Sequence, residues 1–256
     1  MDEKLVFDVA WYDEPMEAQE AVSLMRRFFH RLQVISPWCM PFDISGSTAR
    51  LSHLAFREDY SDFEELTYRC MVDPELRYFS KSHPDEKRFL PDSTTPLGFR
   101  AFFSDYPQRN GLKDAVKIVF HVGGDKPNFV NTLLINIPKY QTENASWTCS
   151  ELEIPDAIFE FLIDFFAADT CNLATREFQN DFVNRKTDRF HIGWMTYTTN
   201  KQAADALKDD PRCRPYGDGV IIRLGDGPHV LKDPQARAAA LEIRDKLIKA
   251  DAARWW

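Results

Sequence analysis

The sequence predicts an α+β protein, with a mixed, mainly antiparallel sheet on which helices pack. Three observations predict this class. Strand-like and helical segments alternate irregularly along the chain, two strand-like runs are joined by a hairpin connection, and the helical segments have one apolar face. A chain of 256 residues, 44% of them hydrophobic, can bury a sizeable core. We expect a single domain over residues 1–256, or two lobes over residues 1–113 and 114–256.

The first elements are a strand and an amphipathic helix. Residues 5–11 have the composition of a half-buried strand. Asp13 is placed as the N-cap of the next helix and Pro15 in its first turn, where proline is tolerated. Apolar residues then recur at three- and four-residue spacing as far as Val34. This spacing predicts a helix whose apolar face packs on the sheet.

Residues 36–113 have the least regular pattern. A strand is possible over residues 50–56, and residues 60–70 are typical of a short helix. Prolines punctuate the rest of this region. Long irregular segments of compact domains are usually functional. We therefore treat the region as either an insertion or half of a binding surface.

From residue 114 the pattern becomes regular. Residues 115–122 and 129–137 are predicted strands, and a glycine-containing hairpin connection joins them. The elements expected after the hairpin are a helix from Pro155, strands over 171–178 and 191–198, a short helix over 201–207, a strand over 220–224 and a last helix capped by Asp233. This order is typical of an antiparallel or mixed sheet with helices beside it.

Charge and composition limit the partners and the compartment. The chain has 32 Lys and Arg against 40 Asp and Glu, a net charge of −8, so we expect no direct contact with nucleic acid. Its acidic start and the lack of a long apolar run predict neither a secretory signal nor a membrane span, and favour the cytoplasm. The five dispersed cysteines indicate free thiols rather than a metal site, and no cofactor is expected.

The sequence contains little that indicates catalysis. Gly123-Gly124-Asp125 lies between two predicted strands, whereas phosphate-binding loops lead from a strand into a helix. His121 and His191 both lie on predicted strands and could meet for acid–base chemistry. We expect no enzyme and no catalytic residue. A small hydrolase that uses His121 or His191 is the enzymatic alternative, and an adaptor is the other non-enzymatic one.

Acidic side chains are concentrated in three parts of the chain. They indicate either solvated helix faces or electrostatic complementarity to a basic protein partner. The residues predicted to contact such a partner are Asp13, Glu14, Glu17, Asp59, Asp62, Glu64 and Glu65. The third group consists of Asp205, Asp209 and Asp210.

The C-terminal part carries a resemblance to a known family. A predicted strand with Gly193-Trp194-Met195-Thr196-Tyr197 is followed by a short helix and then by Tyr216-Gly217-Asp218-Gly219. This arrangement resembles immunity protein family 52, and the match runs from about residue 190 to the end. Elsewhere only the length and the helix near the N-terminus match.

The resemblance implies a non-enzymatic inhibitor that binds a cognate nuclease toxin, delivered by type VI secretion or another polymorphic toxin system. The toxin would carry a restriction-endonuclease-like domain. A nuclease needs a basic groove for its phosphate substrate, and an acidic protein can occupy or block such a groove. We expect the family-signature residues Gly193, Trp194, Tyr197 and Gly219 to be structural, with Trp194 in the core.

Overall fold

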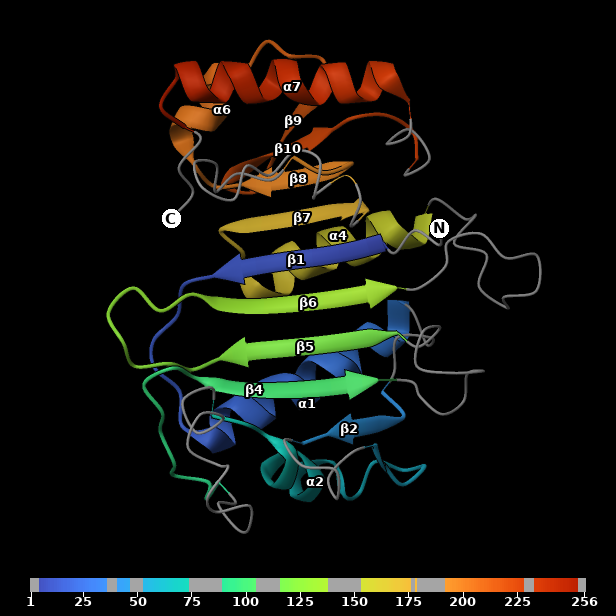
Figure 1. Cartoon of the computed structure of the whole chain (residues 1–256), viewed down its shortest axis with the longest axis vertical. Coiled ribbons are helices and arrows are strands. Elements are labelled where there is room, and N and C mark those ends of the chain that lie inside the picture. The colour runs from blue at the N-terminus through green and yellow to red at the C-terminus, as the bar shows by residue number, and fades with distance from the viewer. Residues whose placement is uncertain are drawn as a thin grey trace, which may run out of the picture. The chain divides into compact units, whose positions relative to one another are not determined.

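The computed structural model is shown in Figure 1. The structure describes residues 5–35, 41–46, 53–73, 89–104, 116–137, 153–175, 178, 192–227 and 233–252. The chain forms two compact units: unit 1 is Met1–Ala10 with Lys139–Trp256, and unit 2 is Trp11–Pro138. The units therefore divide after Pro138, whereas the lobe boundary suggested by the sequence falls after residue 113.

Unit 2 contains an antiparallel sheet with two helices beside it. Its strands are β2 (Asp43–Ser45), β3 (Leu54–Ala55), β4 (Phe99–Ser104), β5 (Lys117–Val122) and β6 (Asn131–Ile137), in the order β3-β2-β4-β5-β6. Its helices are α1 (Ala18–Ile35) and α2 (Phe63–Cys70). The predicted hairpin is confirmed as β5 and β6.

Aromatic side chains hold the helices of unit 2 on its sheet. From α1, Phe28 meets Phe120 of β5 and Phe29 meets Phe103 of β4, with ring centroids 5.2 and 4.9 Å apart. Phe63 of α2 stacks on Phe103, with a centroid separation of 5.8 Å. All five rings are buried. The apolar spacing along α1 therefore marks its packing face, as predicted.

The start of α1 differs from the prediction. The helix begins at Ala18, so Asp13 is not its N-cap. Instead, the Glu17 N–H donates to Glu20 Oε2 at 2.9 Å, as in a capping box, and the Ala18 N–H donates to Ser93 O at 2.8 Å. A carbonyl far along the chain thus accepts one of the free N–H groups at the start of the helix. The residues around Ala18 cannot indicate such a distant contact.

Unit 1 also contains an antiparallel sheet with helices packed on it. Its strands are β1 (Leu5–Trp11), β7 (Thr170–Thr175), β8 (Met195–Thr198), β9 (Cys213–Tyr216) and β10 (Gly219–Arg223), in the order β1-β7-β8-β10-β9. Its helices are α4 (Glu153–Phe166), α6 (Lys201–Leu207) and α7 (Pro234–Lys249). Asp233 caps α7 as predicted, because its Oδ1 accepts the Gln235 N–H at 2.8 Å.

The antiparallel strands of each unit and the helices beside them confirm the predicted α+β class (Figure 1). Every strand pairing within the two units is antiparallel. Within the described ranges, no helix is long and apolar enough to cross a bilayer.

One strand of unit 1 contains an unfavourably placed carboxylate. Asp8 of β1 lies opposite Asn172 of β7, and burial raises the pKa of Asp8 from 3.8 to about 6. An acid whose pKa is higher in the folded state destabilises that state when it is ionised. The charged form of Asp8 therefore opposes folding at neutral pH.

We expect Asp8→Asn to raise the free energy of unfolding by about 2 kcal/mol at pH 7. The gain should disappear as the pH falls from about 6 to below the unfolded value of 3.8, because the carboxyl is then neutral in both states. Urea denaturation at pH 7 and below pH 4 measures both values, with the exposed Asp13→Asn as control. Equal or lower stability of Asp8→Asn at pH 7 would contradict the prediction.

Candidate functional site

The predicted contact acids near the N-terminus lie beside the start of α1 in unit 2. Asp13 and Glu14 are exposed, and Glu17 is half-buried. Asp13 Oδ1 accepts the N–H of Glu14 at 2.9 Å, and Glu17 Oε2 accepts the amide of Gln19 at 2.9 Å. Two of these three carboxylates therefore make local hydrogen bonds at the helix start.

The second group of predicted acids lies around the start of α2. Asp59 accepts the Ser61 N–H at 3.0 Å, and hydrogen bonds from Ser61 hold the pKa of Asp59 below its ordinary value. The half-buried Asp62 accepts the Arg57 N–H at 3.0 Å. These bonds organise the turn that leads into the helix.

The acids within α2 itself are both exposed, and one of them is paired. Glu64 bonds Arg26 of α1, with Arg26 Nη1 2.6 Å from Glu64 Oε1, whereas Glu65 is exposed in the same helical turn. Arg26 lies on the order of 14 Å along α1 from Glu17. Arg27 and Arg31 are also exposed on α1. In the described part of unit 2, the second acidic group therefore includes at least one carboxylate that is already paired with a basic side chain.

The aromatic residues of the family signature lie in the interior of unit 1. Trp194 is fully buried, its indole N–H donates to Gly225 O at 2.9 Å, and the Arg223 guanidinium lies 5.3 Å from its ring centroid. Tyr197 on β8 is buried as well. Both side chains stabilise the packing of unit 1.

The two signature glycines allow close approach of neighbouring strands. A Cβ atom on Gly193 would lie 2.3 Å from Leu173 O, and one on Gly219 would lie 2.3 Å from Thr198 O. Both distances are far shorter than any contact that a real Cβ atom makes. The backbone of β7 and β8 would have to move to accept a side chain at either position.

Of the two histidines of the hydrolase alternative, the structure describes one. The Nε2 atom of His121 lies 2.5 Å from Leu97 O, and its ring packs edge-on against Phe129 with centroids 5.1 Å apart. Burial lowers the pKa of His121. His191 lies outside the described residues. His121 is thus engaged with a backbone carbonyl of its own unit.

Unit 2 also contains a histidine–aspartate pair, His53 with Asp43, which the sequence analysis did not predict. His53 Nδ1 lies 2.8 Å from Oδ2 of Asp43, which is fully buried, and the Ser104 hydroxyl donates to Asp43 Oδ1. A carboxylate on Nδ1 fixes the orientation of an imidazole ring. Among the described residues, no three His, Cys, Asp or Glu side chains are grouped so as to hold a metal ion. The pair ties β3 and β4 to β2 at the edge of the sheet.

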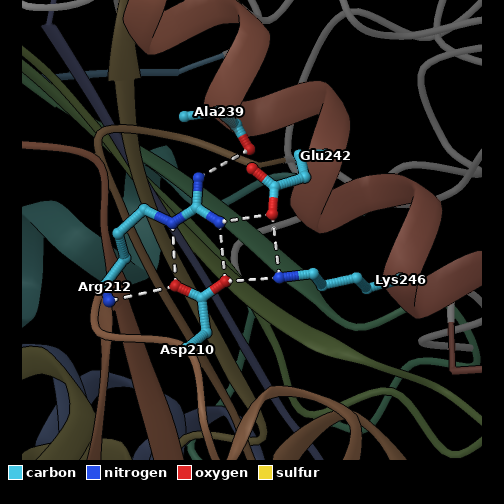
Figure 2. Close-up of polar contacts among 5 residues, drawn as sticks. All are labelled: Asp210, Arg212, Ala239, Glu242 and Lys246. Atoms are coloured by element: carbon cyan, nitrogen blue, oxygen red, sulfur yellow. Dashed lines mark hydrogen bonds and ion pairs between the residues drawn. The ribbon is translucent and has the colours of Figure 1, made fainter.

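Figure 2 shows an ion-pair ring in unit 1. Arg212 donates from Nε to Asp210 Oδ1 at 2.8 Å and from Nη2 to Asp210 Oδ2 at 2.6 Å. Lys246 Nζ lies 3.0 Å from the same Oδ2, and Glu242 of α7 accepts from both cations at 3.2 and 2.9 Å. The Arg212 hydrogen bonds hold the pKa of Asp210 well below its usual range.

The position of this ring shows that Asp210 is structural. The sequence grouped Asp210 with Asp205 and Asp209 as acids for a solvated face or a partner, but only 2% of its side chain is exposed. Its interactions join the turn before β9 to α7. Asp205 and Asp209 are exposed.

A second polar row in unit 1 joins α4 to β9 and β10. Three carboxylates spaced four residues apart along α4 each meet one side chain of β9 or β10. The pairs are Asp156 Oδ2 with Arg223 Nη1 at 2.7 Å, Glu160 Oε1 with Arg214 Nη2 at 2.5 Å, and Asp164 Oδ2 with the Tyr216 hydroxyl at 3.0 Å.

Comparison with known proteins shows similarity at the level of the fold. No family model matches the sequence, and neither does any curated protein. Among solved structures, the Pseudomonas aeruginosa T6SS protein PA0821 is similar, with a TM-score of 0.54 and 12% identity. The similarity covers 99% of this chain and 73% of that one. At this identity the likeness establishes a shared fold alone.

Proposed function

We propose that this chain is an immunity protein that binds a cognate nuclease toxin of the type VI or another polymorphic toxin system and neutralises it mole for mole. The observation that carries the proposal is the fold similarity to a T6SS protein over 99% of the chain. The segment that begins Gly193-Trp194 resembles immunity protein family 52. This resemblance supports the role of an immunity protein rather than that of a toxin.

The charge of the chain supports this proposal. A nuclease attracts nucleic acid with a basic surface, which an acidic protein complements. With a net charge of −8, this chain is repelled by nucleic acid and attracted by such a toxin. Opposed potentials raise association rates to about 10⁸ M⁻¹s⁻¹, and the tightest nuclease–immunity pairs reach dissociation constants of about 10⁻¹³ M.

Protection of cells tests the proposal directly. The toxin encoded beside the gene for this chain would be produced from an inducible promoter in a bacterial host, with or without the chain. We expect the chain to restore growth and to keep the host nucleic acid intact. An unrelated type VI toxin serves as the specificity control. Failure to protect at matched expression would overturn the proposal.

A further inference from the structure

The seam between α4 and β9 forms a charged and aromatic surface in unit 1. We define the α4–β9 surface as Glu160, Asp164, Arg214 and Tyr216. Arg214 is 51% exposed and Glu160 is 41% exposed, so their ion pair lies at the protein surface. The Arg214 guanidinium also lies 5.1 Å from the centroid of the Tyr216 ring. An arginine is therefore held here by a carboxylate and an aromatic ring together.

Further carboxylates lie beside this surface. Burial and then the negative charges of Asp218, Asp164 and Asp169 raise the pKa of Tyr197. Asp218 is exposed in the turn between β9 and β10, two residues after Tyr216. Tyr197 is in edge contact with Tyr216, with centroids 6.3 Å apart. Glu160, Asp164 and Asp218 thus outnumber Arg214 here, and the neighbouring Arg223 is paired with Asp156 of the same helix, so the surface has an excess of negative charge.

The outward side of α4 is unusually apolar for a surface helix. Ile158, Phe159 and Leu162 are buried, yet Phe161 and Phe165 are only half-buried, with ring centroids 5.4 Å apart. A helix with apolar residues around most of its circumference is usually covered on several sides. Half-exposed aromatic rings, arginine and tyrosine are residue types that protein interfaces favour.

The edge strand next to this surface does not favour strand addition. β9 ends the strand order of unit 1 among the described residues. The two β9 residues whose backbone N–H and C=O positions point away from β10 are Cys213 and Pro215. The Cys213 N–H already donates to Asp210 O at 3.0 Å, and proline has no N–H. A partner at this edge must therefore be recognised through side chains.

We infer that the α4–β9 surface docks a basic protein surface, whose arginine or lysine side chains reach Asp164 and Asp218. The internal Arg214–Glu160 pair on Tyr216 shows how the surface holds a guanidinium. A second copy of this chain would bring two negative surfaces together, and a phosphate backbone would be repelled. The choice of a toxin as the basic partner rests on the proposed function, whereas the chemistry of the surface does not.

This inference places the contact in unit 1, whereas the sequence places it at the acids of unit 2. In unit 2, Asp62 accepts the backbone N–H of Arg57, and Glu64 is paired with the Arg26 side chain of the same unit. In unit 1, Asp218 is exposed on the turn between β9 and β10. Charge reversal can therefore distinguish the two surfaces.

The first test uses an arginine-rich peptide as a probe that does not depend on the toxin. Backbone amide spectra of the isotope-labelled full chain would be recorded during titration with the peptide. We expect the signals of Tyr216, Asp218 and Asp164 to shift most, and Asp164→Lys with Asp218→Lys to weaken binding about tenfold. Asp205→Lys, an exposed acid on α6, is the matched control and should bind as wild type does. Shifts confined to other residues, or none, would overturn the inference.

The second test uses the cognate toxin in a binding titration. If the Asp164→Lys, Asp218→Lys double variant loses affinity about tenfold while Glu65→Lys does not, the contact lies at the α4–β9 surface. If Glu65→Lys loses affinity and the double variant does not, the inference is wrong and the proposed function stands. If wild type does not bind the toxin, the proposed function fails and the peptide titration alone decides the inference. Circular dichroism of each variant excludes loss of fold.

Discussion

Asp210→Asn is expected to lower the free energy of unfolding by about 3 kcal/mol, the largest single loss among the variants considered. The substitution leaves Arg212 and Lys246 facing an uncharged, buried amide (Figure 2). Two cations then share the single carboxylate of Glu242, and the half of the ring that is most buried loses its negative charge, which destabilises the folded state. Because these interactions join the turn before β9 to α7, that packing should loosen first.

Denaturant unfolding of wild type and Asp210→Asn at pH 7 measures the loss. The pKa of Asp210 is lower in the folded state, so its contribution is complete above the ordinary value of 3.8 and decreases as the pH falls below it. The difference between the two proteins should therefore shrink in acid. Glu242→Gln is the control, and it should lose much less because the Glu242 side chain is 56% exposed. Equal losses for both variants would contradict a structural role specific to Asp210.

Gly193→Ala is expected to cost about 2–3 kcal/mol of stability, the second largest effect. The new Cβ would approach Leu173 O within 2.3 Å and Asn172 Oδ1 within 2.6 Å. A backbone oxygen in a paired strand cannot move aside as a flexible side chain can, so β7 and the segment entering β8 must separate. Thermal and denaturant unfolding should both report the loss.

Gly217→Ala is the control for Gly193→Ala. At Gly217 an added Cβ meets nothing closer than the Tyr197 hydroxyl at 4.0 Å, so only the positive φ of 52° penalises alanine. That penalty is about 1 kcal/mol. If Gly193→Ala and Gly217→Ala lose the same stability, close strand approach is not the reason for glycine at position 193.

Elements with a strong local pattern could be predicted from the sequence. The apolar spacing of α1 predicts its C-terminal end and the face that carries Phe28 and Phe29, although the helix begins later than the predicted cap at Asp13. The β5–β6 hairpin and the capped start of α7 at Asp233 also follow from residues adjacent in the chain. In these elements local preference and tertiary packing agree.

The strands β2, β4 and β9 could not be predicted from the sequence, because pairing with adjacent strands of the sheet determines their conformation. β2 is only three residues long, and β9 contains Pro215, which is unusual in a strand away from an edge. β4 does alternate, with Phe99, Ala101 and Phe103 buried, but the prolines around it suggested a loop. Pairing with β2 and β5 makes it a strand.

Side-chain pairs that join distant segments could not be predicted from the sequence either, because the tertiary fold brings the partners together. Asp210 and Lys246 meet only because the turn before β9 lies beside α7. Arg214 and Glu160 meet across the seam between β9 and α4. The acidic groups were visible in the sequence, but which carboxylates are internally paired depends on the fold.

The central claim is stoichiometric capture, and titration of toxin activity with this chain tests it most directly. Nuclease activity of the purified cognate toxin would be measured against increasing amounts of the purified chain. We expect a linear loss of nuclease activity that is complete at a molar ratio of about one, as for a tight complex. Full toxin activity at that ratio, or inactivation of many toxin molecules by one molecule of this chain, would contradict it.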